Sequence, residues 1–357
     1  MQFRNLKDLV IKISSSLKLT DVSDIGNYPV YGAQGLVGFT DTYQTDTKSI
    51  ALIKDGAGVG RVQIIPAYSS VLGTLQLLKP VGDTNIAYLY YLIKHLNLGQ
   101  SFNGTTIPHI YFKDYGETVV RYRNYNEQLE ISNVLIRLDD YVAAKEIQMN
   151  QFDELIKSRF NELFGDPLLN EKGFPVEKLS VSCPFNVYKG NVEITNGKVW
   201  LLNLDMIESN TGAVLSKQYV CLSEVGNSVI KFDKDCVLYS KLRPYLNKVV
   251  ISDGSGYASS ELVYMKTGKR IRKEFLANLL RSKSFVDYID SKSGGAKMPR
   301  ASMDFLRSFP LIVPPERLQE QFATFVNQID KSKFVVQQQI KDLKELLDKK
   351  MNEYFGG

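Results

Sequence analysis

The stretch DELIKSRFNELFG, residues 153–165, recurs in similar form as KELLDKKMNEYFG at residues 344–356. The two stretches align without gaps, and six of their thirteen positions are identical. Shared helical composition alone does not explain that much identity. Each stretch ends a long run with helical periodicity. The chain is therefore predicted to contain two copies of one plan, each a globular part followed by a long helix.

Apolar residues along the two runs keep one heptad register, at a constant offset of 191 residues. A single helix of this kind is often an amphipathic surface helix of its own domain, but matched registers in both copies predict that the two helices pair. Because the first helix leaves the first globular part and the second must return, the pair is predicted to be antiparallel and about 60 Å long. The heptad positions are Leu135, Leu138, Val142, Met149, Phe152, Ile156 and Leu163, then Val326, Ile329, Val336, Ile340, Leu343, Leu347 and Tyr354.

The composition is that of a folded globular protein. Of 357 residues, 44% are hydrophobic and 23% are charged, and the length allows two domains with cores. No apolar run approaches the roughly twenty residues of a membrane span, and the N-terminus lacks the layout of a secretory signal. A cytoplasmic protein is predicted. Three widely spaced cysteines and two histidines form no zinc or disulfide pattern, so no metal site is expected.

The glycine-rich segment KDGAGVGRVQII, residues 54–65, has two interpretations. Its Asp55-Gly56 pair between apolar runs predicts a β-hairpin. Its alternating glycines suggest a dinucleotide-binding loop, but such a loop must open a helix, and residues 61–65 alternate like a strand. A nucleotide site is therefore not predicted. The segment CVLYSKLRPYLNKVVI, residues 236–251, takes the same place in the second copy with different side chains at its turn.

Positive charge is concentrated in the second globular part. Ten Lys or Arg residues stand against three acidic residues between Lys266 and Arg300, whereas the first long helix has five basic and eight acidic residues. The stretch is either a solvated surface or a surface that meets a polyanion. A loop with Gly104 and Pro108 recurs 191 residues later. It is either a simple connection or a source of donors for phosphates and base edges, and its recurrence favours the second interpretation.

Five segments, in this order, resemble the specificity subunit of type I restriction-modification systems, and the resemblance covers essentially the whole chain. They are YPVYGAQGLVG (28–38), IALIKDGAGVGRV (50–62), NGTTIPHI (103–110), FGDPLLNEKGF (164–174) and VPPERLQEQF (313–322). The resemblance implies an α+β fold in which two similar mixed α/β target recognition domains are joined by two long antiparallel coiled-coil helices, as a pseudo-twofold internal duplication. The implied divisions are residues 1–122 (recognition domain 1), 123–165 (central conserved helix), 166–310 (recognition domain 2) and 311–357 (C-terminal conserved helix).

The same resemblance implies the function and the partners. Each recognition domain is expected to read one part of a split sequence in double-stranded DNA, while the helices set the spacing and dock methyltransferase subunits, to which the restriction subunit is added. The chain itself is expected to be non-catalytic and to hold no cofactor, since S-adenosylmethionine, ATP and Mg are used by the partner subunits. The sequence agrees, because its nearest string to an adenine-methylation motif, VPPE at residues 313–316, lacks the aromatic residue that stacks on a flipped base.

Loop residues are predicted to contact DNA by analogy of position. Arg and Lys can bind phosphate or guanine, Asn and Gln can pair with adenine, and Thr methyl groups can meet thymine. The candidates are Tyr31, Gln34, Lys54, Arg61, Asn103, Thr105, Thr106 and His109 in the first half, and Tyr239, Lys241, Arg243, Lys292, Lys297 and Arg300 in the second half.

Two other functions remain open on the sequence alone. A coiled-coil adaptor would bind proteins through its helices without sequence-specific DNA binding, and its affinity for DNA would not fall steeply with salt. A nuclease or methyltransferase acting alone would show turnover with a metal ion or S-adenosylmethionine.

Overall fold

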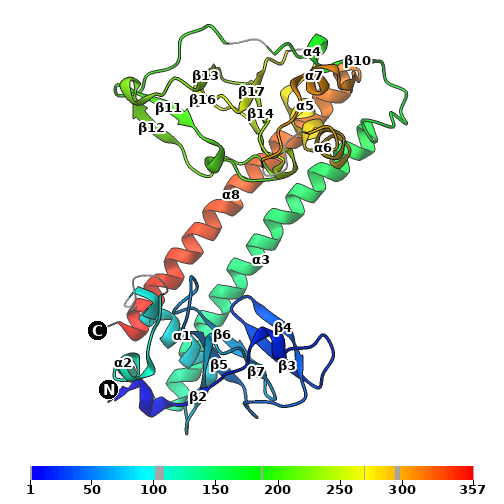
Figure 1. Cartoon of the computed structure of the whole chain (residues 1–357). Coiled ribbons are helices and arrows are strands. Elements are labelled where there is room, and N and C mark those ends of the chain that lie inside the picture. The colour runs from blue at the N-terminus through cyan, green and yellow to red at the C-terminus, as the bar shows by residue number, and fades with distance from the viewer. Residues whose placement is uncertain (1, 101–107, 186–187, 269, 294–297, 357) are drawn as a thin grey trace. The chain divides into compact units, whose positions relative to one another are not determined.

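The computed structural model describes residues 2–100, 108–185, 188–268, 270–293 and 298–356 (Figure 1). The chain divides into two compact units. Unit 1 comprises Met1–Glu146 and Gln338–Gly357, and unit 2 comprises Ile147–Gln337. Each long helix therefore contributes one part of its length to each unit.

The described residues of unit 1 form three small sheets. One has the strand order β2-β8-β5-β6 and is antiparallel throughout, another has the order β4-β3-β7, and the third pairs β1 with β9. The strands are β1 (Gln2–Asn5), β2 (Val10–Ser14), β3 (Tyr28–Gly32), β4 (Gly35–Thr40), β5 (Ser49–Ile53), β6 (Val62–Ile65), β7 (Ser70–Val71), β8 (Leu75–Pro80) and β9 (Val119–Tyr122), and the helices within unit 1 are α1 (Ile86–Leu96) and α2 (Phe112–Tyr115).

Strand β5 is an interior strand of the four-stranded sheet, and all of its residues are buried. The expected hairpin between β5 and β6 is present, but it does not turn tightly at Asp55-Gly56 as the sequence suggested. Its loop runs over residues 54–61 before β6 begins. Helix α1 packs beside β5 and β6. It begins where the side chain of Asn85 accepts hydrogen bonds from the backbone N–H groups of Ala87 (3.0 Å) and Tyr88 (3.1 Å).

Unit 2 repeats part of this plan. Strand β14 pairs with β15 and β17, as β5 pairs with β6 and β8, and β10 pairs with β18, as β1 pairs with β9. A further sheet has the order β12-β11-β16-β13. The strands are β10 (Val176–Lys178), β11 (Lys198–Leu202), β12 (Gln218–Cys221), β13 (Val229–Phe232), β14 (Val237–Ser240), β15 (Val249–Ile251), β16 (Gly256–Ser259), β17 (Leu262–Met265) and β18 (Pro310–Ile312), and the helices within unit 2 are α4 (Leu179–Ser182), α5 (Lys273–Arg281), α6 (Lys283–Asp290) and α7 (Met303–Ser308).

A fully buried glutamine joins the long helix of unit 1 to helix α1. The side-chain Oε1 of Gln128 accepts a hydrogen bond from the backbone N–H of Asn85 (2.8 Å), and its Nε2 donates to the carbonyl of Arg123 (2.8 Å). The glutamine therefore fixes the start of α1 against the start of the long helix.

Gln319, which lies 191 residues later, makes the same connection in unit 2. It is also fully buried. Its Oε1 accepts from the backbone N–H of Arg272 (2.9 Å), the residue before α5, and its Nε2 donates to the carbonyls of Pro314 (2.8 Å) and Arg270 (2.9 Å). Two glutamines at matched positions with matched partners support the internal duplication more specifically than helical periodicity does.

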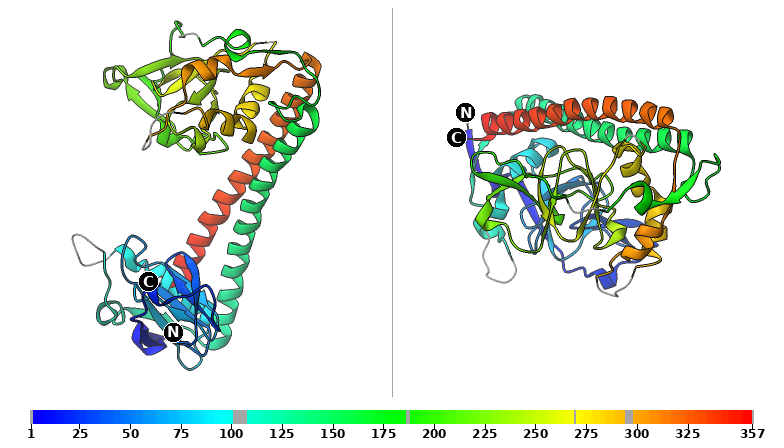
Figure 2. Two further views of the ribbon diagram at one scale, coloured as in Figure 1. Left: turned by 45° about the vertical axis from the view of Figure 1, so that its right-hand side comes forward. Right: turned by 90° about the horizontal axis from the view of Figure 1, so that it is seen from above.

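The two long helices are α3 (Tyr125–Phe164) and α8 (Glu316–Phe355). Helix α3 ends before Gly165, whose φ of +70° suits a helix C-terminus. Within each unit the two helices lie side by side (Figures 1 and 2). Residues from both helices share one core cluster in unit 1, and the same holds in unit 2. All the heptad positions named above are buried or half-buried.

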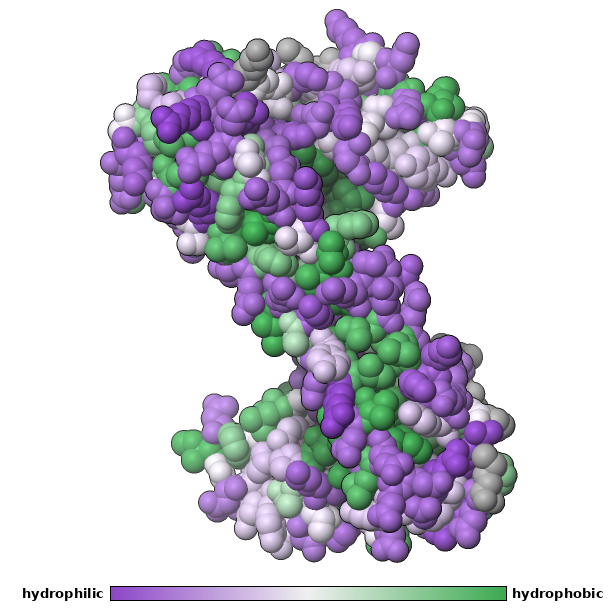
Figure 3. All heavy atoms as spheres, turned by 180° about the vertical axis from the view of Figure 1, so that it is seen from behind, coloured by the Kyte–Doolittle hydropathy of each residue, from purple (hydrophilic) through white to green (hydrophobic). Residues whose placement is uncertain are grey.

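The face shown in Figure 3 is largely hydrophilic, with smaller hydrophobic patches. Within the described ranges, no helix is both long and apolar enough to cross a membrane. The same residues contain no cluster of three or more His, Cys, Asp or Glu side chains placed to hold a metal ion.

Candidate nucleic-acid interface

The loop that follows the central strand has the same position in both units. In unit 1 it comprises residues 54–61 and contacts residues 108–110, and we call this assembly tip 1. In unit 2 it comprises residues 241–248 and contacts residues 299–301, and we call this assembly tip 2. Each tip therefore joins the loop of a hairpin to a segment that follows it far along the chain.

Two backbone hydrogen bonds hold tip 1 together. The N–H of Gly56 donates to the carbonyl of Pro108 (3.0 Å), and the N–H of Ile110 donates to the carbonyl of Lys54 (3.1 Å). These bonds fix His109, which lies between the two bonded residues of its segment. The predicted residues Lys54 and His109 are thus brought together.

Tip 2 has the same two bonds. The N–H of Arg243 donates to the carbonyl of Pro299 (2.8 Å), and the N–H of Ala301 donates to the carbonyl of Lys241 (2.9 Å). Arg300 takes the place that His109 has in tip 1, 191 residues earlier. Three of the predicted residues, Lys241, Arg243 and Arg300, therefore lie in one tip.

The side chains of His109 and Arg300, which have matched positions in the two tips, are each paired with a carboxylate. In tip 1, His109 Nδ1 contacts Asp55 Oδ1, and the imidazole packs 4.1 Å from the ring of Tyr111. In tip 2, Arg300 donates from Nη2 to Glu261 Oε1 (3.0 Å) and from Nε to Oε2 (3.3 Å). Hydrogen bonding to Glu261 raises the pKa of Arg300 above its ordinary value. Sequence reasoning missed Asp55 and Glu261 as partners, because neither has a distinctive motif; the repeat offset that aligns His109 with Arg300 was the available signal.

Four other predicted residues lie at the surface or near it. Tyr31 is in β3 and Gln34 is exposed in the turn between β3 and β4. Arg61 is exposed at the end of tip 1, and Lys292 is exposed with its ammonium 5.8 Å from the ring of Phe305. The remaining predictions Asn103, Thr105, Thr106 and Lys297 fall outside the described residues.

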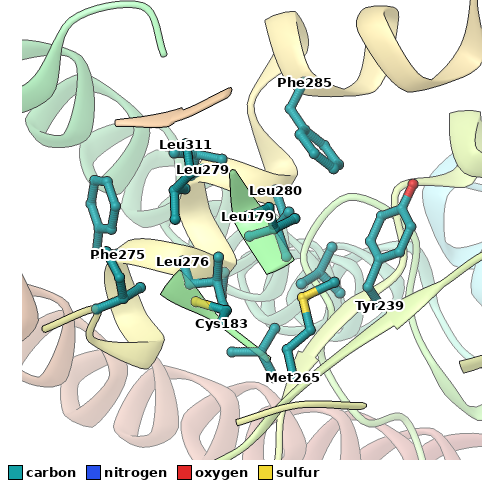
Figure 4. Packing of buried hydrophobic residues seen from close by; sticks show 14 of the residues in the cluster. Leu179, Cys183, Tyr239, Met265, Phe275, Leu276, Leu279, Leu280, Phe285 and Leu311 are labelled. Carbon is teal, nitrogen blue, oxygen red and sulfur yellow. The ribbon is translucent and has the colours of Figure 1, made fainter. Parts of the chain in front are cut away.

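The prediction for Tyr239 does not fit its position. The side chain lies in β14 and is 2% exposed, packed edge-on against Phe285 in the core of unit 2 (Figure 4). Burial raises the pKa of its phenol. All four residues of β14 are buried, so here a core position of the strand was taken for a loop position.

The basic stretch from Lys266 to Arg300 is less positive in space than in sequence. Carboxylates from other parts of unit 2 neutralise much of it, since acids distant in the sequence fold back onto it. The ion pairs to such acids are Lys266–Asp233, Arg270–Glu177, Arg272–Glu320, Lys273–Asp235 and Arg300–Glu261. The described part of the stretch is therefore not a continuous cationic surface, and binding there depends on individual side chains.

A large cleft in unit 2 has a volume of about 1330 Å³ and is lined by charged side chains, among them Asp153, Lys333 and Arg281. These groups are already paired with protein atoms. Lys333 Nζ lies 2.6 Å from Asp153 Oδ1, and Arg281 Nη2 donates to the carbonyl of Val249 (2.6 Å). The first contact therefore joins α3 to α8, and the second joins α5 to β15.

Comparison with known proteins gives a consistent result. The sequence model of the type I restriction modification DNA specificity domain matches residues 1–151 and 191–345, and these two matched segments fit a duplication into two domains. The chain is 23% identical over 362 residues to the type I restriction enzyme EcoDI specificity subunit of Escherichia coli, covering 90% of this chain and 79% of that protein.

Two solved structures share the fold. The crystal structure of the S subunit of a type I restriction-modification system from M. genitalium has a TM-score of 0.61 at 16% identity, covering 99% of this chain and 96% of that chain. A chain from a structure that describes complex assembly and conformational transition of the type I R-M system has a TM-score of 0.56 at 9% identity, covering 99% and 97%.

Proposed function

Because the chain belongs to the type I restriction modification DNA specificity family, we propose that it reads a DNA sequence split into two parts and docks the subunits that modify and cut that DNA. DNA sequence specificity is the function that the family and the EcoDI subunit share. The observation that carries the proposal is the pair of tips. They have the same backbone hydrogen bonds and different side chains, which is what two readers of different half-sites require.

In this proposal residues 1–122 are recognition domain 1 and residues 166–310 are recognition domain 2. Residues 123–165 and 311–357 are the conserved helices. The bounds of α3 and α8 and the separate core clusters of the two units support this division.

The two long helices act as an antiparallel coiled coil that sets the distance between half-sites. The burial of the heptad positions supports this role. Two ion pairs support the direction. Glu146 pairs with Lys344 in unit 1 (2.8 Å), and Asp153, further along α3, pairs with Lys333, earlier along α8, in unit 2 (2.6 Å).

Methyltransferase subunits dock on the outer faces of these helices, and the restriction subunit joins the complex that they form. Large apolar side chains on the helices support the docking surface, because they remain exposed although both helices have buried seams. They include Tyr141 (60% exposed) in unit 1, and Ile147 (58%), Phe334 (71%) and Val335 (54%) in unit 2.

The chain contributes recognition and no catalysis, and acts in the cytoplasm, where its DNA and partner subunits are. S-adenosylmethionine, ATP and Mg are used by those partners. Burial raises the pKa of Cys183 to about 12 and that of Cys236 to about 11, so neither thiol is a nucleophile near neutral pH. In the unit 2 cleft, Asp153 pairs with Lys333 and Arg281 donates to the carbonyl of Val249, so these charged groups make structural contacts.

The test is to co-express this chain with the methyltransferase subunit of a type I system and to map modified adenines across the host DNA. We expect one motif with two short defined segments around an undefined spacer. A soluble complex that gives no such motif would contradict the proposal and favour the coiled-coil adaptor. Measurable turnover by the isolated chain with S-adenosylmethionine or a metal ion would contradict the non-catalytic role.

A further inference from the structure

Arg300 in tip 2 is held by the protein in a way that leaves one edge of its guanidinium open. Its backbone is fixed on both sides, because the carbonyl of Pro299 and the N–H of Ala301 are both bonded to residues of the neighbouring loop. The side chain is fixed by Glu261, which accepts from Nε and from Nη2. An arginine with an anchored backbone and an anchored side chain presents its remaining donors in one direction.

The donors that remain have a defined pattern. A guanidinium carries five N–H groups, one on Nε and two on each Nη. Glu261 occupies the edge formed by Nε and Nη2, so the edge formed by Nη1 and Nη2 keeps two parallel N–H groups. Among the described residues no other group bonds to this edge. Two parallel donors match the O6 and N7 acceptors that guanine alone presents in the major groove.

The exposure of the pair fits this role. The Arg300 side chain is 57% exposed, whereas Glu261 is 25% exposed, so the carboxylate lies behind the guanidinium. An ion pair this exposed adds little to the stability of a fold. The carboxylate also offsets the positive charge, which makes Arg300 a weak general anchor for phosphates. What the pair does supply is a fixed orientation.

The matched position of tip 1 points to the same role for this place in the fold. His109 also lies between two backbone-bonded residues and also has a carboxylate partner, Asp55. The two copies thus keep a polar side chain oriented by a carboxylate while changing its identity. A position that keeps its support and varies its hydrogen-bonding group is suited to selecting a base.

We propose that Arg300 reads a guanine in the half-site of unit 2 and that Glu261 is the positioning residue that aims it. The inference rests on the proposed function and adds a base and two residues to it. It assigns at least one G·C pair to that half-site.

The test uses the full chain in complex with its methyltransferase subunits. The motif of modified adenines is mapped for the unchanged chain and for Arg300→Lys, Arg300→Ala and Glu261→Gln. Lysine keeps the charge but loses the fork of two donors. We expect both Arg300 variants to lose the preference for a G·C pair at one position of one half-site, with the other half-site unchanged. Glu261→Gln relaxes the same position to a smaller extent.

Arg307→Ala is the matched control. Arg307 lies in the same unit, is 53% exposed and is paired with Asp304 at 3.5 Å, but lies on α7 outside the tip. The motif of modified adenines for Arg307→Ala should be the same as that of the unchanged chain.

A second measurement tests whether Arg300 binds the N7 atom of the guanine. Duplex DNA carrying 7-deazaguanine at the assigned position should bind the unchanged complex about tenfold more weakly than guanine does, and should bind the Arg300→Ala complex no more weakly than guanine does. Unchanged bases at the other positions of the unit 2 half-site show that unit 2 of a variant is folded.

Three results would overturn the inference. One is an unchanged motif for both Arg300 variants, and another is an equal loss of affinity for all duplexes, which would make Arg300 a phosphate contact. The third is an equal response to 7-deazaguanine with and without Arg300. If the unchanged complex gives no split motif, the proposed function itself fails, and that result is distinct from a split motif that Arg300 does not affect.

Discussion

In tip 1 the chain has Gly56 and Gly60 where tip 2 has Arg243 and Asn247. All four residues have positive φ, at +91°, +86°, +51° and +51° respectively. The backbone conformation has therefore been kept in both copies while the side chains differ. Since glycine adopts this region at the least cost, tip 2 keeps its side chains, above all that of Arg243, against local conformational preference.

The space around the two glycines explains where such a change is possible. A Cβ added to Gly56 would meet nothing within 4 Å, whereas a Cβ added to Gly60 would lie 2.2 Å from the backbone nitrogen of Gly99. In tip 1, Gly56 could therefore be replaced at the cost of backbone strain alone. Replacement of Gly60 would add a steric clash with Gly99.

The largest expected effect is that of Gly60→Ala. The methyl group forces residues 98–100 away from the loop in addition to straining φ, so we expect the free energy of unfolding to fall by about 4 kcal/mol. Thermal unfolding followed by circular dichroism measures this. Trp200, the only tryptophan, is buried in unit 2, and its fluorescence reports on that unit separately.

Gly56→Ala is the control for this prediction. It introduces the same strain with open space around the methyl group, so the expected loss is about 1 kcal/mol. Equal losses for the two variants would mean that contact with Gly99 contributes nothing and that backbone conformation alone requires both glycines.

The buried glutamines Gln128 and Gln319 allow the two units to be compared where each long helix contacts its globular part. Gln319→Ala removes the partners of one N–H and two carbonyls, whereas Gln128→Ala removes the partners of one N–H and one carbonyl. Unsatisfied buried polar groups are costly. We expect losses of about 3 kcal/mol for Gln319→Ala, seen in urea unfolding followed by Trp200 fluorescence, and about 2 kcal/mol for Gln128→Ala, seen by circular dichroism.

Gln338→Ala serves as the control, because this glutamine is on α8 but exposed. It should change stability by no more than about 0.5 kcal/mol. If Gln319→Ala lowers the free energy of unfolding no more than the control does, water replaces the hydrogen bonds of the glutamine. The buried glutamine would then not be a stabilising feature common to both units.

The sequence predicted the features that depend on periodicity and repetition. The long helices, the repeat offset of 191 and the equivalence of residues 54–61 with residues 241–248 all follow from patterns that one chain displays twice. The start of α3 differs from the predicted Arg123 by two residues, because the chain is still extended at Arg123, just after β9. Helix ends depend on local capping more than on periodicity.

The sequence could not predict features that depend on which distant side chains meet. Glu261 lies in the turn between β16 and β17, Arg300 lies on a later segment, and only the fold pairs them. The neutralisation of the basic stretch could not be predicted for the same reason. The carboxylates that pair with it come from β10, the segment before β14 and the start of α8, which are distant in the sequence. Tyr239 was taken for a loop residue, although β14 continues to Ser240 and all four of its residues are buried.

The smallest expected effect concerns Arg243 and separates recognition from stability most directly. Its φ of +51° is unusual for a bulky residue, and its guanidinium Nε is buried without a hydrogen-bond partner within the described part of the chain. Arg243→Gly places at tip 2 the residue that tip 1 has at Gly56.

For this variant we expect the free energy of unfolding to rise by up to about 1 kcal/mol, measured by Trp200 fluorescence in urea, because relief of strain exceeds the entropy cost of glycine. The same variant should bind target duplex DNA about tenfold more weakly in complex with its methyltransferase subunits, because it loses a contact. Asn247→Gly is the comparison, since that side chain donates to the carbonyl of Arg281 at 3.0 Å and its removal should not stabilise the unit. A destabilised Arg243→Gly variant with unchanged DNA affinity would show that the strained arginine supports the fold and has no part in recognition.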